Sequence, residues 1–313
     1  MKKTLLYFML AFCFIIKANA QDLLGDLAKE DSLKVKTNIA TATFKSTRII
    51  NLQSVEMTGK GNLQFMISHR FGYLWKEGKG LTNVAQLFGL NSGFANTYMS
   101  FDYSFTDWLN TGVAATGNAQ FETWAKLKLV RQQSGKKNIP ITISWFSMMH
   151  WDASEGPSPD DLAWNRLSFI HQILIARKFS ENFSLQLIPS YIHYNYVPYG
   201  INNTNNIFSL GIGGRMKLSH KTAITLEYTR QLNGYKDLLD ETASALNYKP
   251  DVLSLGYDWD TGGHIFQFFI SSASTSSNIT QLSANLNQMK LGNFSLGFNL
   301  NRSYGIKKVV QTH

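Results

Sequence analysis

The chain is short of charge, since only 16% of its 313 residues are Asp, Glu, Lys or Arg. Soluble globular proteins carry about 25% charged residues. Proline and cysteine are also scarce, at 6 and 1 residues, whereas 44% of the chain is apolar and 13% aromatic. This content excludes disorder, which requires few aromatic residues and a high net charge. The composition also argues against an ordinary cytosolic enzyme.

Long apolar runs are absent except near the N-terminus. There Lys2 and Lys3 precede an apolar run over 5–16, and Ala18-Asn19-Ala20 follows it. This order is typical of a cleaved signal peptide. The run is shorter than the roughly 20 residues that a membrane-spanning helix needs, and beyond it the longest apolar run has only four residues. We therefore predict that residues 1–20 are removed on export and that no transmembrane helix follows.

Removal of this leader changes the chemistry that the chain can offer. Cys13 is the only cysteine, so the remaining chain has no thiol for disulfides or metal sites. A lipoprotein anchor at Cys13 is a poorer alternative, because the bulky Phe12 precedes it. Loss of three leader lysines lowers the net charge from +9 to +6. The largest basic cluster is Lys136-Lys137, so no nucleic-acid partner is expected.

Apolar residues recur at every second position, which is the period of a strand with one apolar face. Met99, Phe101 and Tyr103 alternate with Ser100 and Asp102 in this way. The pattern predicts about twelve strands, near residues 62–71, 98–105, 109–116, 121–129, 141–145, 164–177, 184–191, 208–217, 224–229, 253–259, 264–271 and 294–301. Segment 164–177 is ambiguous, because its apolar run also suits a helix or a strand buried on both faces.

The connections between these strands alternate in length. The long ones cover residues 72–93, 150–163, 197–206, 232–250 and 272–292. The short ones cover 106–108, 131–138, 178–182, 219–221 and 260–263, and only 116–120 breaks the rhythm. Short periplasmic turns opposite longer outer loops are typical of transmembrane barrels. The sequence therefore predicts an all-β fold, a transmembrane antiparallel up-and-down β-barrel of about 12 strands at residues 62–304, inserted in outer-membrane lipid.

Aromatic residues support a membrane barrel, because several flank the short turns where an interfacial girdle lies. These are Phe105, Trp108, Phe179, Phe183, Tyr257 and Trp259. A soluble aromatic core is the alternative interpretation.

Residues 21–61 precede the first strand and lack its alternation, while 305–313 form a short tail. Part of 23–35 suits a short amphipathic helix. The arm either hangs in the periplasm or enters the lumen. We favour a lumen plug for 40–58, with Lys45, Arg48 and Glu56 as its charged residues.

Three stretches resemble an exported β-barrel family catalogued as domain of unknown function 5777. The first combines Phe44-Lys45-Ser46-Thr47-Arg48, Gln53-Ser54-Val55-Glu56 and Leu63-Gln64-Phe65-Met66-Ile67-Ser68-His69-Arg70-Phe71-Gly72. The second is Ile175-Ala176-Arg177-Lys178-Phe179-Ser180-Glu181-Asn182-Phe183-Ser184-Leu185-Gln186, and the third is Thr261-Gly262-Gly263-His264-Ile265-Phe266-Gln267. The resemblance covers about 44–304 and implies an outer-membrane barrel, but no substrate, reaction or catalytic residue. Its motif residues His69, Arg70 and His264 are the ones to test first.

Catalytic, cofactor and metal sites are not predicted. The seven histidines lack a paired spacing that would place two ligands on one face. Gly262-Gly263 follows Asp260-Thr261 without the helix and Lys-Ser/Thr of a phosphate loop, so a hairpin turn explains it better. No Gly-x-Ser-x-Gly elbow occurs, although Ser/His pairs across strands leave a lipid-acting barrel enzyme as a third alternative.

Charges on the polar faces of the strands are the most informative chemistry. An Arg or Lys facing lipid costs about 2–4 kcal/mol near the midplane, so these side chains are expected to face the lumen. The candidate lumen-lining residues are Asp102, Glu122, Lys126, Lys128, Arg166, Arg215, Lys217, Glu227 and Asp258. An open lumen predicts a passive channel or binding barrel for small polar solutes, with a lean toward anions. Charges paired with the plug predict instead a non-conducting barrel that anchors a partner. The oligomeric state stays open.

Overall fold

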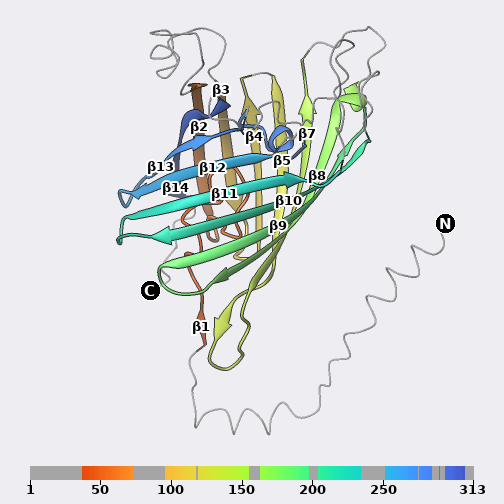
Figure 1. The fold of residues 1–313 in the computed structure, drawn as a ribbon. Coiled ribbons are helices and arrows are strands. Elements are labelled where there is room, and N and C mark those ends of the chain that lie inside the picture. The colour runs from red at the N-terminus through yellow and green to blue at the C-terminus, as the bar shows by residue number, and fades with distance from the viewer. Residues whose placement is uncertain are drawn as a thin grey trace, which may run out of the picture.

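The computed structural model describes residues 37–73, 96–117, 119–154, 163–196, 204–233, 251–273, 275–283, 289 and 293–306. Twelve strands close into one barrel, each antiparallel to both neighbours (Figure 1). In chain order they are β2 (Asn62–Tyr73), β3 (Asn96–Ser104), β4 (Leu109–Thr116), β5 (Gln120–Val130), β7 (Thr142–Asp152), β8 (Leu167–Lys178), β9 (Phe183–Tyr194), β10 (Asn206–Lys217), β11 (Thr222–Gln231), β12 (Val252–Asp260), β13 (Ile265–Ser271) and β14 (Ser295–Gly305).

The barrel closes where its last strand meets its first. β14 pairs with β2 from Gly305 opposite Asn62 to Ser295 opposite Tyr73. Both barrel termini therefore lie at one end, which we call the terminal end; the opposite end is the loop end. Every other pair joins two barrel strands that are consecutive along the chain. The predicted twelve-stranded up-and-down architecture is therefore confirmed.

The ambiguous segment 164–177 is a strand rather than a helix. A short 3₁₀ turn, η1 (Ala163–Arg166), leads directly into β8. β8 then pairs with β7 and β9 along most of its length. Among the described residues no helix is long and apolar enough to span a bilayer. The leader, the expected helix within 23–35 and most of the long connections lie outside the described residues.

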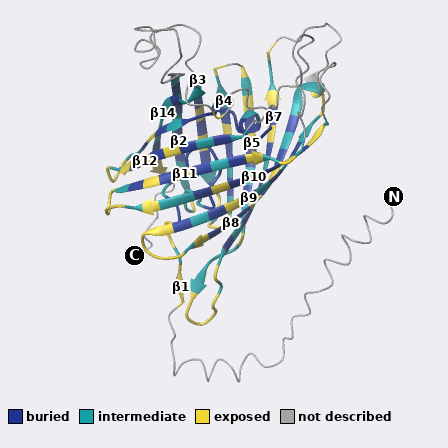
Figure 2. Ribbon diagram, viewed as in Figure 1, coloured by how far each residue is buried: buried dark blue, intermediate teal, exposed yellow. Residues whose placement is uncertain are grey.

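The strands bury alternate residues, as Figure 2 shows by the change from buried to exposed along each arrow. On β12, Leu255 is 45% exposed on the outer face, whereas Ser254 is fully buried on the inner one. The apolar residues of the sequence alternation thus lie on the outer face, as expected for a barrel in contact with lipid.

The inner face departs from the expected pattern on one side of the barrel. Buried apolar side chains line the lumen on neighbouring strands β7 to β10: Phe146, Met148, Ile170, Leu174, Ala176, Ile188, Ile192 and Ile207. The remaining strands turn mainly polar residues inward, among them Gln64, Ser100, Asp102, Glu227, Asp258, Gln267, Asn299 and Asn301. Strands β7 to β10 also bury polar side chains, among them Gln172, Gln186 and Ser190. The lumen therefore has one half in which apolar and polar side chains mix, which we call the apolar half, and one mainly polar half.

Two segments that do not belong to the barrel sheet fill the lumen. Residues 43–56, which we call the lumen segment, enter from the terminal end and are largely buried. The short helix α4 (Asn278–Ser283) lies between β13 and β14 in the chain and contacts β8 to β11. Below the barrel, β1 (Asn38–Ile39) pairs with β6 (Gln133–Ser134), which lies in the connection between β5 and β7. Figure 1 shows this small sheet at the terminal end.

Candidate functional site

The lumen segment is a short hairpin. Its two arms are joined by a bridge between Arg48 and Gln53 and by the amide of Ser54 donating to the carbonyl of Thr47 at 2.9 Å. The turn closes where the Ile49 amide donates to the Leu52 carbonyl at 2.8 Å. This leaves the amides of residues 50–52 without a partner in the hairpin itself, so the barrel wall must supply one.

A single carboxylate supplies it. Glu227 of β11 accepts hydrogen bonds from the amides of Ile50, Asn51 and Leu52 at 2.7 to 2.8 Å through one oxygen. Charge-assisted bonds to backbone amides are about twice as strong as neutral ones. The acid therefore holds the tip of the hairpin at one point of the wall.

The carbonyls of the lumen segment are also bound by wall side chains. Lys126 is completely buried, and its ammonium donates to the carbonyls of Thr47, Ser54 and Glu56 at 2.8 to 3.2 Å. Three wall side-chain amides also donate to carbonyls of the segment, and one of them, that of Gln186, accepts from the Val55 amide as well. They belong to Gln186, Gln267 and Asn299. The wall thus holds the segment through side chains and not through a strand ladder.

Glycines in the wall make room for the aliphatic side chains of the segment. A methyl group added at Gly213 of β10 would lie 2.3 Å from the Ile49 Cδ1 atom, and one at Gly211 would lie 3.1 Å from the Leu52 Cδ1 atom. A 2.3 Å approach is impossible between carbon atoms, whose optimal separation is about 3.5–4.0 Å. Gly211 and Gly213 therefore allow the lumen segment to approach β10 closely.

The lumen segment also contacts the segment that enters from the loop end. The Arg48 guanidinium donates to the Asn278 Oδ1 atom of α4 at 3.2 Å, and Arg70 donates to the Ser276 Oγ atom at 2.9 Å. Arg70 also donates to the side chain of Asn51. The two fillings of the lumen therefore form one hydrogen-bonded network across the barrel.

The predicted charges fall into three groups. Five lie buried inside the barrel: Asp102, Glu122, Lys126, Glu227 and Asp258. Three are half-buried near the terminal end: Lys128, Arg215 and Lys217. Arg166 lies outside the strands, in η1, where it donates to the Ser154 carbonyl.

The charged residues of the arm and the family-motif histidines also have defined places. Lys45 forms an ion pair with Asp260 at 2.5 Å, and the Glu56 carboxylate accepts the amide of Thr43 at 2.7 Å. His69 lies on the outer face, where its Nδ1 atom is 3.0 Å from the Thr97 hydroxyl. The His264 Nε2 atom is 3.1 Å from a guanidinium nitrogen of Arg302 at the terminal end. In the ranges that the structure describes, no three His, Cys, Asp or Glu side chains come together as metal ligands.

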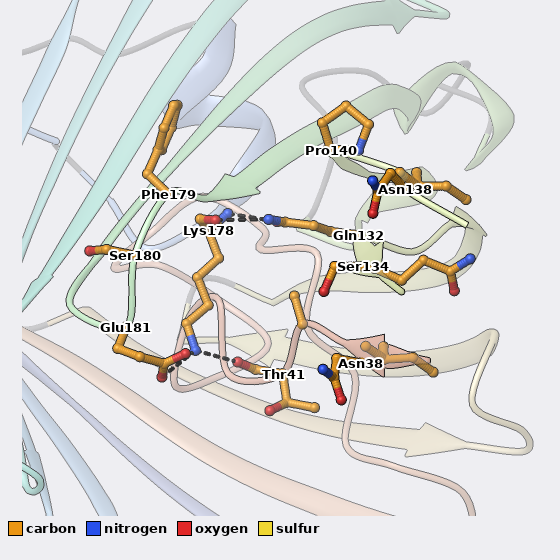
Figure 3. A pocket seen from close by; sticks show the side chains of 14 residues that line it. Asn38, Thr41, Gln132, Ser134, Asn138, Pro140, Lys178, Phe179, Ser180 and Glu181 are labelled. Atoms are coloured by element: carbon orange, nitrogen blue, oxygen red, sulfur yellow. Dashed lines mark hydrogen bonds and ion pairs between the residues drawn. The ribbon is translucent and has the colours of Figure 1, made fainter. Parts of the chain in front are cut away.

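An open cavity of about 650 Å³ lies where the chain enters the barrel, between the β1–β6 sheet and the turn after β8 (Figure 3). Lys178 donates to the Thr41 carbonyl at 3.2 Å and to the Glu181 carboxylate at 2.9 Å. The hydrogen bond from this ammonium lowers the pKa of Glu181. The Gln132 side chain bonds the main chain of Lys178 through both of its polar ends. These contacts fix the path of the arm at the terminal end.

Sequence reasoning missed three parts of this arrangement. The inward apolar residues of β7 to β10, the α4 filling and the glycine–aliphatic contacts were not expected. One signal was present for the first: Ile173-Leu174-Ile175-Ala176 has no polar face and suits a strand buried on both sides.

Two porins and an outer membrane channel are among the solved structures of similar architecture. NanC porin matches with a TM-score of 0.47 and 7% identity, over 77% of this chain and 98% of that one. KdgM porin matches with a TM-score of 0.44 and 7% identity, over 79% and 99%. An outer membrane channel from Pseudomonas putida F1 has a TM-score of 0.46 and 13% identity, over 83% and 100%. At such scores and identities no residue role or substrate is transferred.

Among curated proteins, no match to the chain is significant. A family model described as a membrane bound beta barrel domain (DUF5777) matches residues 44–304, which cover the lumen segment and the twelve barrel strands except for Thr43 and Gly305. The chain therefore belongs to the DUF5777 family of membrane-bound β-barrels.

Proposed function

We propose that this protein is an outer-membrane barrel that binds and passes small polar solutes, and that the lumen segment closes it at rest. The observation that carries the proposal is the way in which the segment is held. Side chains of the wall bind its main chain, as Lys126 and Glu227 do, and no barrel strand pairs with it. The segment can therefore move without breaking a strand pair of the barrel.

The passage would follow the polar half of the lumen. Its buried carboxylates are Asp102, Glu122, Glu227 and Asp258, and its cations are the buried Arg70 and Lys126 and the half-buried Lys128. These charges nearly balance once Arg48 of the lumen segment has left. We therefore propose weak charge selectivity, and the net charge of the whole chain is a poor guide to the preferred solute.

A second candidate is a non-conducting barrel that presents its loops to a partner. The apolar half of the lumen favours it, because removing the segment exposes Ile188 and its neighbours to water. Such exposure costs roughly 25 cal/mol per Å² of apolar surface. The two candidates thus differ in whether the segment ever leaves its place.

A reversible tether distinguishes the candidates. The Ser46 hydroxyl lies 3.3 Å from the Asn301 side-chain oxygen on β14, so Ser46→Cys with Asn301→Cys is designed to lock the segment to the wall. In planar bilayers the channel proposal predicts conductance steps only after the disulfide is reduced. Thr261→Cys with His264→Cys, in a turn outside the lumen, is the matched control. No steps in either redox state, after verified insertion, would favour the non-conducting barrel.

A further inference from the structure

Arg48 occupies a site in the lumen whose groups are suited to a free guanidinium ligand. The side chain is only 3% exposed and lies where the lumen segment meets α4. Its guanidinium donates to the Tyr98 hydroxyl and to the Asn278 Oδ1 atom. Arg48 reaches the site from its own hairpin, and its Nε atom has no hydrogen-bond partner. Arg48 therefore uses only some of the N–H donors of its guanidinium group.

One carboxylate orients both acceptors. Tyr98 donates its hydroxyl proton to Glu122 at 2.8 Å, and Asn278 donates its side-chain amide to the same carboxylate at 2.8 Å. The acceptor atom of each residue is consequently turned toward the guanidinium. Hydrogen bonds in such a chain polarise one another, and this strengthens each bond in a buried site. The acceptors are thus oriented by groups other than Arg48.

Aromatic faces complete the site. The guanidinium carbon lies 4.5 Å from the centre of the Tyr98 ring and 6.0 Å from that of Trp124. The Trp124 indole donates to Asp102 at 3.1 Å, which places a second acid at the edge of the ring. Cations over aromatic faces are stabilised most when they are desolvated, and guanidinium is hydrated more weakly than ammonium.

We propose that Tyr98, Glu122, Trp124 and Asn278 form a binding site for a guanidinium-bearing solute, which Arg48 occupies as a tethered substitute. The inference deepens the proposed function by naming a solute class. A solute that arrives at this site competes with Arg48 and, by replacing it, removes the contact between the lumen segment and α4. A planar guanidinium fits two acceptors and a ring face, whereas an anion would meet two carboxylates.

The test measures binding, so it does not depend on conduction. Full-length protein is refolded in detergent, its assembly is verified by heat-modifiable gel mobility, and L-argininamide is titrated by calorimetry. Arg48→Ala empties the site, and Lys60→Ala, at an exposed residue after the lumen segment, is the control. A tethered side chain competes at an effective concentration of about millimolar. We therefore expect Arg48→Ala to bind L-argininamide at least about tenfold more tightly than the unaltered chain or Lys60→Ala.

Two further arms establish the chemistry. L-lysinamide carries the same charge without a guanidinium and should bind Arg48→Ala at least about tenfold more weakly. Adding Tyr98→Leu to Arg48→Ala should abolish this difference. Arg48→Gln, which keeps most of the side-chain stem, serves if Arg48→Ala does not assemble. Equal binding of the two probes, or no gain when Arg48 is removed, overturns the inference. Guanidinium binding without conductance would leave the site standing and remove the channel.

Discussion

Asn51 donates its backbone amide to both carboxylate oxygens of Glu227, at 2.8 and 3.0 Å. The amides on either side, those of Ile50 and Leu52, share one of these oxygens. A carboxylate on the wall thus does what a strand partner does elsewhere in a sheet, and it satisfies three donors at once. The tip of the lumen segment is consequently fixed by a single side chain of β11.

Replacing that side chain should release the tip. In Glu227→Gln the remaining side-chain oxygen can still accept the three amides, but the charge that strengthens these bonds is lost and an NH2 group replaces the oxygen that accepts the second bond from Asn51. Losing charge-assisted bonds and facing the buried Asn51 amide with a donor costs about 1–3 kcal/mol. Amide hydrogen exchange at residues 50–52 should therefore be faster by one to two orders of magnitude, while the barrel strands stay protected. Glu181→Gln, at an exposed turn, is the control. Unchanged exchange at the tip would show that Glu227 does not hold it.

A larger side chain at Gly213 should displace the lumen segment. Gly213→Val places carbon where Ile49 lies, and such overpacking costs about 1–3 kcal/mol. We expect increased protease cleavage within 43–56, and its reversal when Ile49→Ala is added. Gly263→Val is the control, because nothing lies within 4 Å of a methyl group there. Failure of Ile49→Ala to restore protection would contradict the proposed contact.

Removing both cations of the arm should raise conductance if the lumen segment closes a channel. Lys45→Ala breaks the ion pair with Asp260, and Arg48→Ala breaks the contact with Asn278. The double variant should show more frequent conductance steps in planar bilayers than the unaltered chain. Lys136→Ala with Lys137→Ala, in the connection at the terminal end, is the control. An unchanged trace would remove the plug from the proposal.

Arginine substitutions on the two faces of β12 should have different effects on assembly. Leu255→Arg puts a charge on the lipid face at a cost of about 2–4 kcal/mol near the midplane, so heat-modifiable, membrane-inserted protein should be largely lost. Ser254→Arg should insert, but it collides with Asn51, whose side-chain amide bonds the Ser254 hydroxyl at 2.8 Å. Protease should then cut the lumen segment. Equal assembly of both with an intact segment would refute the assignment of faces.

Acid should weaken the ion pair at the entry cavity. The pKa of Glu181 is lowered in the fold by Lys178, so the pair contributes above the unfolded pKa of the carboxyl and is lost as pH falls through its folded pKa. Carboxyl-detected NMR should show the Glu181 midpoint rising in Lys178→Met. Asp107→Asn, at another turn, should leave it in place. An identical midpoint in Lys178→Met would exclude the pair.

Much of the barrel could be predicted because lipid imposes a simple rule on each strand. Leu253, Leu255 and Tyr257 alternate with polar residues and mark β12 without knowledge of its partners. The alternating lengths of the connections then indicated which strand ends lie together at each end of the barrel. The faces of β8 were harder to predict, because Ile173 and Leu174 are both apolar. Leu174 faces inward, and only the packing inside the lumen explains why an apolar residue lies there.

The site was less predictable because the lumen segment has no period to detect. Glu227 was identified only as a charge on a polar face, and its three amide partners lie more than 170 residues away in the chain. Gly213 makes room for Ile49, but nothing in the sequence links these two distant residues. The aromatic residues that surround Arg48 could not be assigned either, since Tyr98 occupies a polar-parity position where no apolar partner was expected.

The two segments that fill the lumen adjoin the two strands that close the barrel. Residues 43–56 come directly before β2, and α4 comes shortly before β14 in the chain. During assembly, both fillings can therefore be laid against the open sheet before β14 meets β2, and neither must be threaded into a finished cylinder. Because of this order along the chain, the pairing of β14 with β2 is the step that encloses both segments in the lumen.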